Sequence, residues 1–571
     1  MKKYAIKCVL LLALICILSI IFPKTGVNIQ ADYSKDEVPA ASSFGEKYYK
    51  TEPFPFINTE KYTFAIRVSG IPDHISSRDD SLFSPNGEVE FYSSNLLYSQ
   101  IKAAKLPAEK VKDIDLLTLR KQGIQKTYYH FSLIPLVLLM LALPYLYKSL
   151  KIAAAQPQGY WFFACFLTWL AMQFWAATFL PYYHGSDAWR HFFSGAWYFN
   201  HILPISLDDK YFIEPVWGMN YAISSADWGY LFSFKLAAIL DYFLNSPLVI
   251  NVRYAQIIIS AAIVLITVYF VGFWQAFLVL TIYSIVPQST YINLYTTLDS
   301  YAFIAAIFAL LYGRYGKQKI LTRTCIAIII LLNTRQHYLL CLLPLAYFYL
   351  EEKKYNIKAI IKDTPWIFAA FAIGSYKILY MHWDQWQHHT TYLQVSMAHA
   401  NEVVGKSYTK LINNTIEYDM FFYMPWYITT LLSFFGVFGQ TRCVMPLGNF
   451  AICCALFLYL NTHVKAKDGF VLIIVLLVNI VLSLLMSAGY SYEPQGRYIF
   501  PFLATVPAML YNYNTRLKII FPVGIIIAAM FVFDFTNTPQ AQRGMDIVLH
   551  GEVASWKTLE PPNYCFAGKA K

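Results

Sequence analysis

Charged residues are scarce in this sequence. Of its 571 residues, only 14% are Asp, Glu, Lys or Arg, whereas 57% are hydrophobic. A soluble globular protein carries about 25% charged residues. The scarcity of charge therefore argues against an ordinary soluble enzyme or binding module and places the chain among integral membrane proteins.

Long basic runs, regular cysteine spacings, internal repeats and low-complexity tracts are also missing. The net charge is +11, but a nucleic-acid-binding protein would concentrate such charge in a basic patch on a polar domain. The nine cysteines form no C-x-x-C pair, and seven of them lie in apolar stretches, where we expect packing roles. Cys443 and Cys565 lie outside those stretches, which leaves a disulfide between them as an alternative.

Apolar and aromatic residues are abundant instead, with 45 Tyr and 43 Phe. Apolar stretches recur at a length that suits membrane-spanning helices, which need about 20 residues each. Short loops rich in Lys and Arg stay on the cytoplasmic side. The clearest such loops are residues 148–151, 314–319, 351–354, 465–467 and 516–518.

Threading spans through these basic loops predicts an all-α polytopic membrane protein with about 13 transmembrane helices. The predicted spans are residues 7–23, 129–147, 159–181, 250–271, 273–289, 299–313, 319–333, 337–350, 365–382, 447–462, 469–488, 498–511 and 518–534. Two further apolar stretches, 230–243 and 421–438, break the alternation of sides. We expect them to be interfacial or re-entrant helices on the outer face, where protein can cover their backbone.

Four parts follow from this topology. Residues 1–23 are an N-terminal anchor or signal, and the length of the apolar run favours an uncleaved anchor. Residues 24–128 are polar with strand-like runs at 62–68 and 88–92, so we expect a small β-rich outer domain inserted after the first span. Residues 129–534 form the polytopic membrane domain. Residues 535–571 are polar and form an outer tail.

The largest polar cluster on the predicted outer side follows the third span. Ser186 can cap a helix that begins near Asp187, and on that helix Asp187 and His191 share a face. A carboxylate in this place can take the proton from an acceptor hydroxyl, with His191 tuning it. The alternative is an acid that merely suits the positive end of a helix dipole. His184 could join these two residues around a divalent ion, but no fourth ligand is evident, so we expect no metal.

Three other predicted outer turns carry candidate residues. Asp299 lies between two spans, where an ionisable residue is either a site residue or a solvated helix cap. Arg335, followed closely by His337, can hold a phosphate through its guanidinium fork or can extend to lipid headgroups. Arg497 opens a span on the outer side, against the positive-inside trend. It suits an anion ligand, with Glu493 as its resting partner.

Two strings resemble those of a bacterial family of uncharacterised multi-pass membrane proteins. Residues 433–439 (S-F-F-G-V-F-G) are similar to that family's S-F-W-G-x-F-G string, and residues 495–501 (Q-G-R-Y-I-F-P) are similar to its Q-G-R-Y-x-x-P string. The family also has an outer domain between its first two spans. It resembles in turn the GT-C glycosyltransferases, which use polyprenyl-phosphate sugars and a catalytic acid in the first large outer loop.

The resemblance implies that Asp187 is the catalytic acid of that loop. The surrounding residues depart from the family's P-D-E-x-x-H-F string, because Ser186 replaces the proline and Ala188 replaces the second acid. The missing second acid argues against a two-carboxylate or metal-bridged mechanism. Phe435 also replaces the tryptophan of the first string.

We therefore expect an inverting, metal-independent GT-C glycosyltransferase in a bacterial inner membrane, with its active site facing the periplasm. It would move a sugar from a polyprenyl-phosphate donor to a cell-envelope glycan or glycolipid acceptor. Asp187 would act as general base, helped by His191, while Arg497 and Arg335 hold the donor phosphate and Asp299 orients a sugar hydroxyl. The full set of expected substrate-binding residues is Arg497, Arg335, Asp299, His184, Glu493 and His337.

We expect no cofactor and no nucleic-acid partner; the expected partners are the two substrates and the lipid bilayer. One alternative is a flippase or exporter of lipid-linked sugar, which would place ionisable residues at mid-span. Another is a polysaccharide polymerase or ligase that works at the same rim of the membrane.

Overall fold

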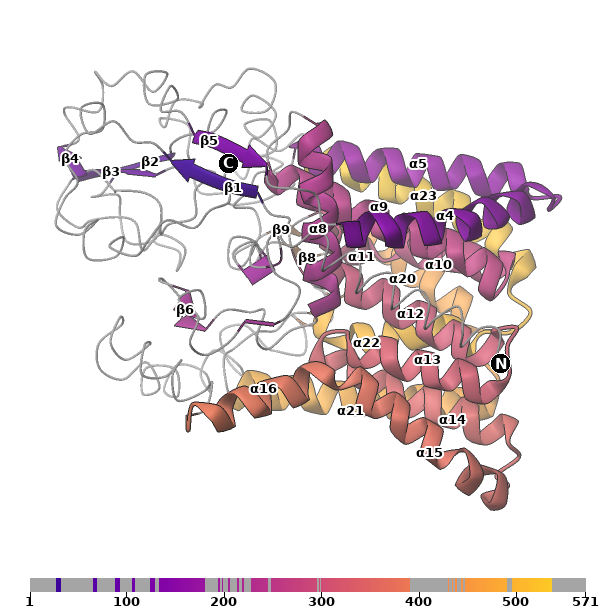
Figure 1. Ribbon diagram of the computed structural model, residues 1–571. Helices are drawn as coiled ribbons and strands as arrows, with labels where there is room; N and C mark the ends of the chain where they lie inside the picture. Colours follow the sequence, from indigo (N-terminus) through magenta and orange to yellow (C-terminus); the bar gives the residue numbers. More distant parts are fainter. Residues whose placement is uncertain are drawn as a thin grey trace.

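The computed structural model describes a helical core and several short segments outside it (Figure 1). The core comprises residues 133–179, 227–244, 248–294, 297, 299–390, 447–489 and 496–536. The short segments are residues 27–31, 65–68, 88–92, 105–107, 124–128, 191, 194–195, 198, 204–205, 213–214, 218–219, 430, 434, 437–438 and 443–444.

The helices follow the apolar stretches of the sequence. They are α4 (Leu133–Ala154), α5 (Gly159–Phe179), α8 (Asp227–Phe243), α9 (Leu248–Phe270), α10 (Phe273–Ile285), α11 (Pro287–Ile292), α12 (Asp299–Tyr315), α13 (Ile320–Leu332), α14 (Leu342–Glu352), α15 (Ile357–Gly374), α16 (Tyr376–Gln387), α20 (Leu447–Asn461), α21 (Ala466–Gly489), α22 (Phe500–Met509) and α23 (Asn514–Thr536). Two 3-10 helices, η5 (Gln336–Cys341) and η7 (Gly496–Ile499), lead directly into α14 and α22.

Two of these helices, α10 and α12, form the centre of the bundle. Nearly all of their side chains are buried. α10 packs against α9 and α23, and α12 packs against α9, α13 and α22. Gly272 interrupts the helical conformation just before α10. Pro287 begins the next helix, α11, just after α10 ends, so α10 is limited to 13 residues.

Each of the twelve spans predicted between residues 129 and 534 contains a helix. Among the described residues, three helical stretches are long and apolar enough to cross a membrane by length and composition: Gly159–Thr178, Ile250–Phe270 and Ala466–Leu485. The prediction of about 13 transmembrane helices is therefore met only in part. The helices α10, α13, α14 and α22 have 10 to 13 residues. At 1.5 Å per residue they are about 15–20 Å long, shorter than a bilayer's hydrocarbon core.

Short strands come from the region predicted as a β-rich domain. β1 (Val27–Ala31) pairs with β5 (Ile124–Tyr128), and β3 (Glu88–Tyr92) pairs with β2 (Ala65–Val68) on one side and β4 (Lys105–Pro107) on the other, all antiparallel. The two strand-like runs of the sequence contain β2 and β3. The rest of region 24–128 lies outside the described residues, so the domain itself stays a prediction.

Two further antiparallel pairs are β6 (Ile213–Glu214) with β7 (Gly218–Met219), and β8 (Val437–Phe438) with β9 (Cys443–Val444). Of the two stretches expected to be interfacial, 230–243 forms most of α8, which packs mainly on α9. The stretch 421–438 lies largely outside the described residues. The first predicted span, 7–23, and the tail 535–571 lie outside them as well, apart from the last two residues of α23. The placement of these parts in a membrane stays a prediction.

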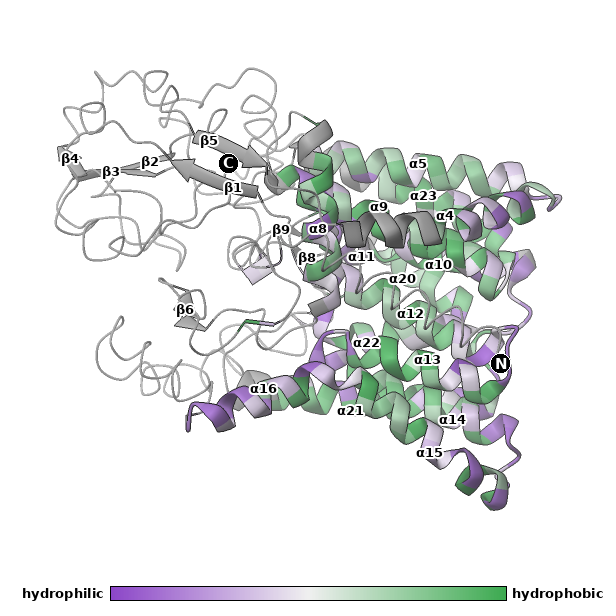
Figure 2. Ribbon diagram, viewed as in Figure 1, coloured by the Kyte–Doolittle hydropathy of each residue, from purple (hydrophilic) through white to green (hydrophobic). Residues whose placement is uncertain are grey.

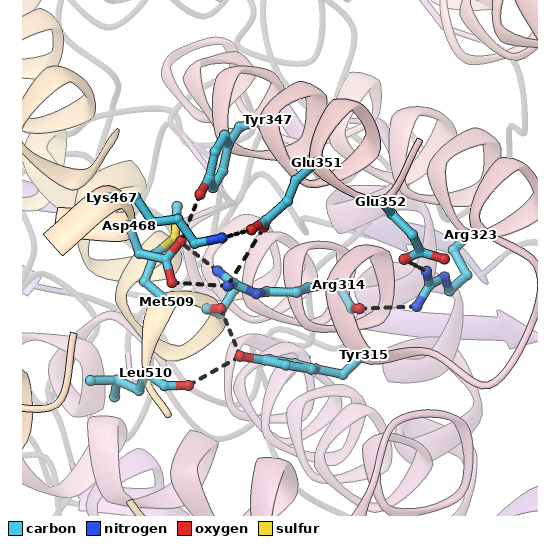
Figure 3. Close-up of polar contacts among 11 residues, drawn as sticks. Arg314, Tyr315, Arg323, Tyr347, Glu351, Glu352, Lys467, Asp468, Met509 and Leu510 are labelled. Atoms are coloured by element: carbon cyan, nitrogen blue, oxygen red, sulfur yellow. Dashed lines mark hydrogen bonds and ion pairs between the residues drawn. The ribbon is translucent and has the colours of Figure 1, made fainter. Parts of the chain in front are cut away.

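Hydrophobic residues cover the middle of the helices, and hydrophilic residues gather toward their ends (Figure 2). One end is closed by ion pairs (Figure 3). Near the end of α12, Arg314 Nη2 lies 2.9 Å from Asp468 Oδ2 and 4.0 Å from Glu351 Oε2. Lys467 pairs with Glu351, and Tyr347 donates a 2.8 Å hydrogen bond to Asp468. Three of the basic loops predicted to be cytoplasmic meet in this cluster.

The other two basic loops lie at the same end. The ammonium groups of Lys148 and Lys317 lie 5.7 and 5.6 Å from the ring centroid of Tyr269. Arg516 donates a 2.6 Å hydrogen bond to the carbonyl of Tyr459 at the end of α20, and the hydroxyl of Tyr315 donates to the carbonyl of Leu510, between α22 and α23. The loops that the charge pattern assigns to one side of a membrane thus gather at one end of the bundle.

Candidate functional site

The opposite end of α12 begins with a buried carboxylate. Asp299 is the first residue of the helix, and its side chain is only 1% exposed. An acid in the first turn interacts favourably with the helix dipole. Arg314, which takes part in the ion pairs of Figure 3, lies fifteen positions after Asp299, which corresponds to a rise of about 22 Å along the helix axis.

Two arginines from distant parts of the sequence converge on Asp299. Arg335, in the turn between α13 and η5, donates from Nη1 to both carboxylate oxygens at 2.7 Å. Arg497, in η7, places its Nη1 atom 3.5 Å from Asp299 Oδ2. Both side chains are largely buried, at 16% and 5% exposed. Burial lowers the pKa of the Arg335 guanidinium, but nearby groups, Asp299 first among them, together raise that pKa above its usual range, so the group stays charged.

His337 completes the cluster, with Nε2 at 3.9 Å from Asp299 Oδ1. Its ring lies edge-on to the ring of Tyr498, with the centroids 5.7 Å apart, so the turns that carry the two arginines contact each other directly. The carboxylate of Asp299 and the two guanidinium groups of Arg335 and Arg497 together carry a net charge of +1.

The turn that carries Arg335 is held by hydrogen bonds from the residues just before it. Asn333 Nδ2 donates to the carbonyl of Ile329, at 2.9 Å, and to that of Gly374 at the end of α15, at 3.2 Å. Thr334 donates to the carbonyl of Leu331 at 2.6 Å. A side chain at Gly374 would meet Leu332, so α15 can approach α13 this closely only with a glycine there.

The start of α12 is anchored by buried polar side chains from α9 and the end of α11. Thr297 Oγ1 accepts a 3.3 Å hydrogen bond from the backbone N–H of Asp299, and Gln256 Nε2 donates to the carbonyl of Thr297 at 2.8 Å. Ser300 donates to Asn293 Oδ1, which Ser260 contacts at 3.4 Å. These side chains fix where the carboxylate of Asp299 stands.

His191 lies at the same end of the molecule but is not among the groups that contact Asp299. It is fully buried, and its Nδ1 atom lies 2.7 Å from the hydroxyl of Tyr230 on α8. Two residues further along α8, Phe232 packs on Tyr301 in the first turn of α12, with ring centroids 6.2 Å apart. Positions 191, 194, 195 and 198 are helical, which fits the helix predicted to begin near Asp187.

The remaining candidates lie outside the described residues. They are Asp187, His184 and Glu493, so their roles stay predictions. The structure therefore brings together four of the eight residues proposed from the sequence: Asp299, Arg335, His337 and Arg497. Among the residues that it describes, no group of His, Cys, Asp and Glu has the arrangement of a metal site.

Comparisons with protein-family models, with curated proteins and with solved structures found no match to this chain. The resemblance to a membrane family and to the GT-C glycosyltransferases thus stays a prediction. Function has to be inferred from the side chains of the site.

Sequence reasoning missed the polar residues that hold the site in place. Gln256, Asn293 and Asn333 belong to this group, and so does Asn479 in α21. For Gln256, Asn333 and Asn479 a signal does exist in the sequence, because each lies inside a predicted span, where an amide side chain is costly unless it has a partner. That signal indicates that the amide has a hydrogen-bond partner, but it does not show which segment of the chain provides this partner.

Two guanidinium groups beside one another suit the recognition of a phosphate. Arginine presents a planar fork of donors that matches phosphate oxygens, and such hydrogen bonds are shorter and stronger than those between neutral groups. In the structure, Asp299 serves as their counter-ion. A phosphate that binds here would share the two arginines with this carboxylate.

Proposed function

We propose that this chain is a polytopic membrane glycosyltransferase of the GT-C type. It would transfer a sugar from a polyprenyl-phosphate donor to a glycan or glycolipid of the cell envelope, at the periplasmic face of a bacterial inner membrane. The observation that carries the proposal is the convergence of Arg335 and Arg497 on one buried carboxylate, at the end of α12 opposite the basic loops.

In the proposed reaction, Arg335 and Arg497 bind the donor phosphate. The acceptor hydroxyl oxygen forms a bond to the anomeric carbon, and the bond from that carbon to the phosphate oxygen breaks. The electron pair of the broken bond goes to the phosphate, whose added negative charge the two guanidinium groups stabilise. Asp187 takes the proton of the acceptor hydroxyl, and His191 supports it from the neighbouring helical turn.

The contacts of Asp299 change the role proposed for it. Both of its oxygens accept hydrogen bonds from Arg335 Nη1. In the proposal Asp299 therefore orients the guanidinium group, rather than a sugar hydroxyl, and keeps the two arginines close together when no phosphate is bound.

The composition of α12 favours an enzyme over a carrier of lipid-linked sugar. Asp299 and Arg314, at opposite ends, are the only charged residues of this central helix, and the side chains between them from Tyr301 to Gly313 are almost all buried. A carrier would place ionisable groups near the midplane, on broken helices. An enzyme that works at one rim needs only the cluster at that rim.

The test is the profile of envelope glycans in a strain whose own copy of the gene is deleted. The strain is complemented with the wild-type chain, Asp187→Asn, Arg497→Gln or the matched control Arg516→Gln at the opposite end. We expect the wild type and the control to restore the missing glycan, and the other two variants to leave its precursor unmodified. An unchanged, complete profile with Asp187→Asn, made at the wild-type level, would remove that residue from the chemistry.

A further inference from the structure

A buried asparagine in the middle of α21 contacts the segment that carries Arg497. Asn479 is 1% exposed. Asn479 and Ser483 are the only polar residues between Phe470 and Met486. This segment belongs to one of the three stretches that can span a membrane. An amide at such a depth is costly unless its donors and acceptor are satisfied, so its presence calls for a specific partner.

Asn479 satisfies both sides of its amide with backbone groups. Its Nδ2 atom donates to the carbonyl of Tyr498 at 2.7 Å, and its Oδ1 atom accepts from the N–H of Phe502 at 3.3 Å. Tyr498 and Phe502 are four residues apart, which is the spacing of the donor and acceptor of one α-helical hydrogen bond. The side chain therefore spans the step at which the 3-10 turn η7 becomes the α-helix α22.

This step decides the direction in which Arg497 points. A 3-10 helix turns by about 120° per residue and an α-helix by about 100°. Converting the four residues of η7 to α geometry would therefore rotate the start of the segment by tens of degrees relative to α22. A side chain that inserts at a backbone hydrogen-bond step is a recognised cause of such local changes in a helix.

We propose that Asn479 is a positioning residue for the anion site: by holding η7 against α22, it aims Arg497 at Asp299 and at the phosphate of the substrate. The inference rests on the proposed function, because it names what directs one of the two phosphate-binding arginines. Asn479 itself does not touch the reacting atoms.

The test is a double-mutant cycle on the purified full-length chain, with farnesyl phosphate, a short polyprenyl phosphate, as the probe. Its dissociation constant is measured for the wild type, Asn479→Leu, Arg497→Gln and the double variant. We expect Asn479→Leu to weaken binding about tenfold in the wild-type background. In the Arg497→Gln background we expect a change of less than about twofold, because the guanidinium that Asn479 aims is already gone.

Thr281→Val serves as the matched control, because it also removes a buried side-chain hydrogen bond, in α10, to the helix's own backbone. It should lower the thermal unfolding temperature without weakening binding. Asn479→Ser is carried through the same cycle, so that the test can be completed if the leucine variant does not fold.

Two results would overturn the inference by itself. One is a similar loss of affinity from Asn479 variants with and without Arg497; the other is no loss when Arg497→Gln does weaken binding. If the wild type and Arg497→Gln bind farnesyl phosphate equally, the proposed phosphate site fails, and the role of Asn479 in it fails as well.

Discussion

At the scale of single residues, the central feature is a carboxylate that shares two buried guanidinium groups. Removing three charges from water costs several kcal/mol per ion. The attraction between the buried charges offsets only part of this cost, even when their geometry is good. A hydrophobic substitute would often be as stable, so the ion cluster of Asp299, Arg335 and Arg497 is weak evidence for stability and better evidence for function. The buried ion pair of Arg314 with Asp468 has the same chemistry, but among the residues that the structure describes no second guanidinium contacts Asp468.

Because two guanidinium groups contact Asp299, the variant Asp299→Asn should have a lower stability that bound phosphate can restore. Removing one partner of a buried ion pair costs about 3–5 kcal/mol, so the ligand-free variant should unfold at a lower temperature than the wild type. Farnesyl phosphate should then stabilise the variant more than the wild type, because it supplies the counter-charge that Arg335 and Arg497 have lost. Thermal unfolding with and without the probe measures both effects.

Asp468→Asn is the matched control at the other end of α12. It should also lower the unfolding temperature, but its response to farnesyl phosphate should equal that of the wild type. If Asp299→Asn gained no more stabilisation from the probe than Asp468→Asn, the two arginines would not be its binding site.

The residue types of the site were readable from the sequence, but their pairing was not. The sequence predicts phosphate binding by both Arg335 and Arg497, because each lies at a predicted outer rim. For Asp299 it predicts contact with a sugar hydroxyl, since nothing in the sequence indicates that the turn after α13 lies beside the first turn of α12. That contact depends on how α12, α13 and η5 pack, which apolar periodicity alone does not fix.

At the scale of elements, the apolar stretches of the sequence predict the positions of the helices well. They predict only in part which helices are long enough to span a membrane. Helix formation follows from long apolar stretches that end at polar turns, and these are visible in the sequence. Whether a helix crosses a membrane also depends on its length after local breaks. Proline and glycine at Gly272, Pro287 and Pro501 divide apolar stretches into helices shorter than a bilayer.

The helical turn that carries His191 packs closely against α8. A side chain at Gly195 would overlap the ring of Phe234 on α8, so the glycine lets the helical turn with His191 lie directly on α8. We expect Gly195→Ala to lower the unfolding temperature and to separate His191 from Tyr230. Adding Phe234→Leu should restore part of the loss, because it removes the ring that the new methyl group meets.

Thermal unfolding of the two single variants and the double variant checks this packing, with Gly469→Ala as the control. A side chain at Gly469 would meet Val464 only at an ordinary contact distance of 3.7 Å. Equal effects of Gly195→Ala with and without Phe234 would mean that the helix bearing His191 does not rest on that ring.

At the scale of the whole molecule, the two polar ends differ in kind. The end with Arg314 carries paired, mutually neutralising charges from α12, α14 and α21, whereas the end with Asp299 carries two guanidinium groups on one carboxylate. The apolar middle of α12 separates them. This arrangement suits chemistry at one rim of a membrane, while the neutralised ion pairs at the other rim hold the helices together.

The most direct test of this arrangement is the side of the membrane that each end faces. Single cysteines are placed at two exposed positions in a variant that lacks the native cysteines: Lys354, beside the ion pairs, and Gln387, at the end of α16 beyond the site. A membrane-impermeant maleimide is then applied to intact spheroplasts and to permeabilised ones. We predict labelling at position 387 in both preparations and at position 354 only after permeabilisation. Labelling of both positions from the same side, or the reverse pattern, would contradict the account.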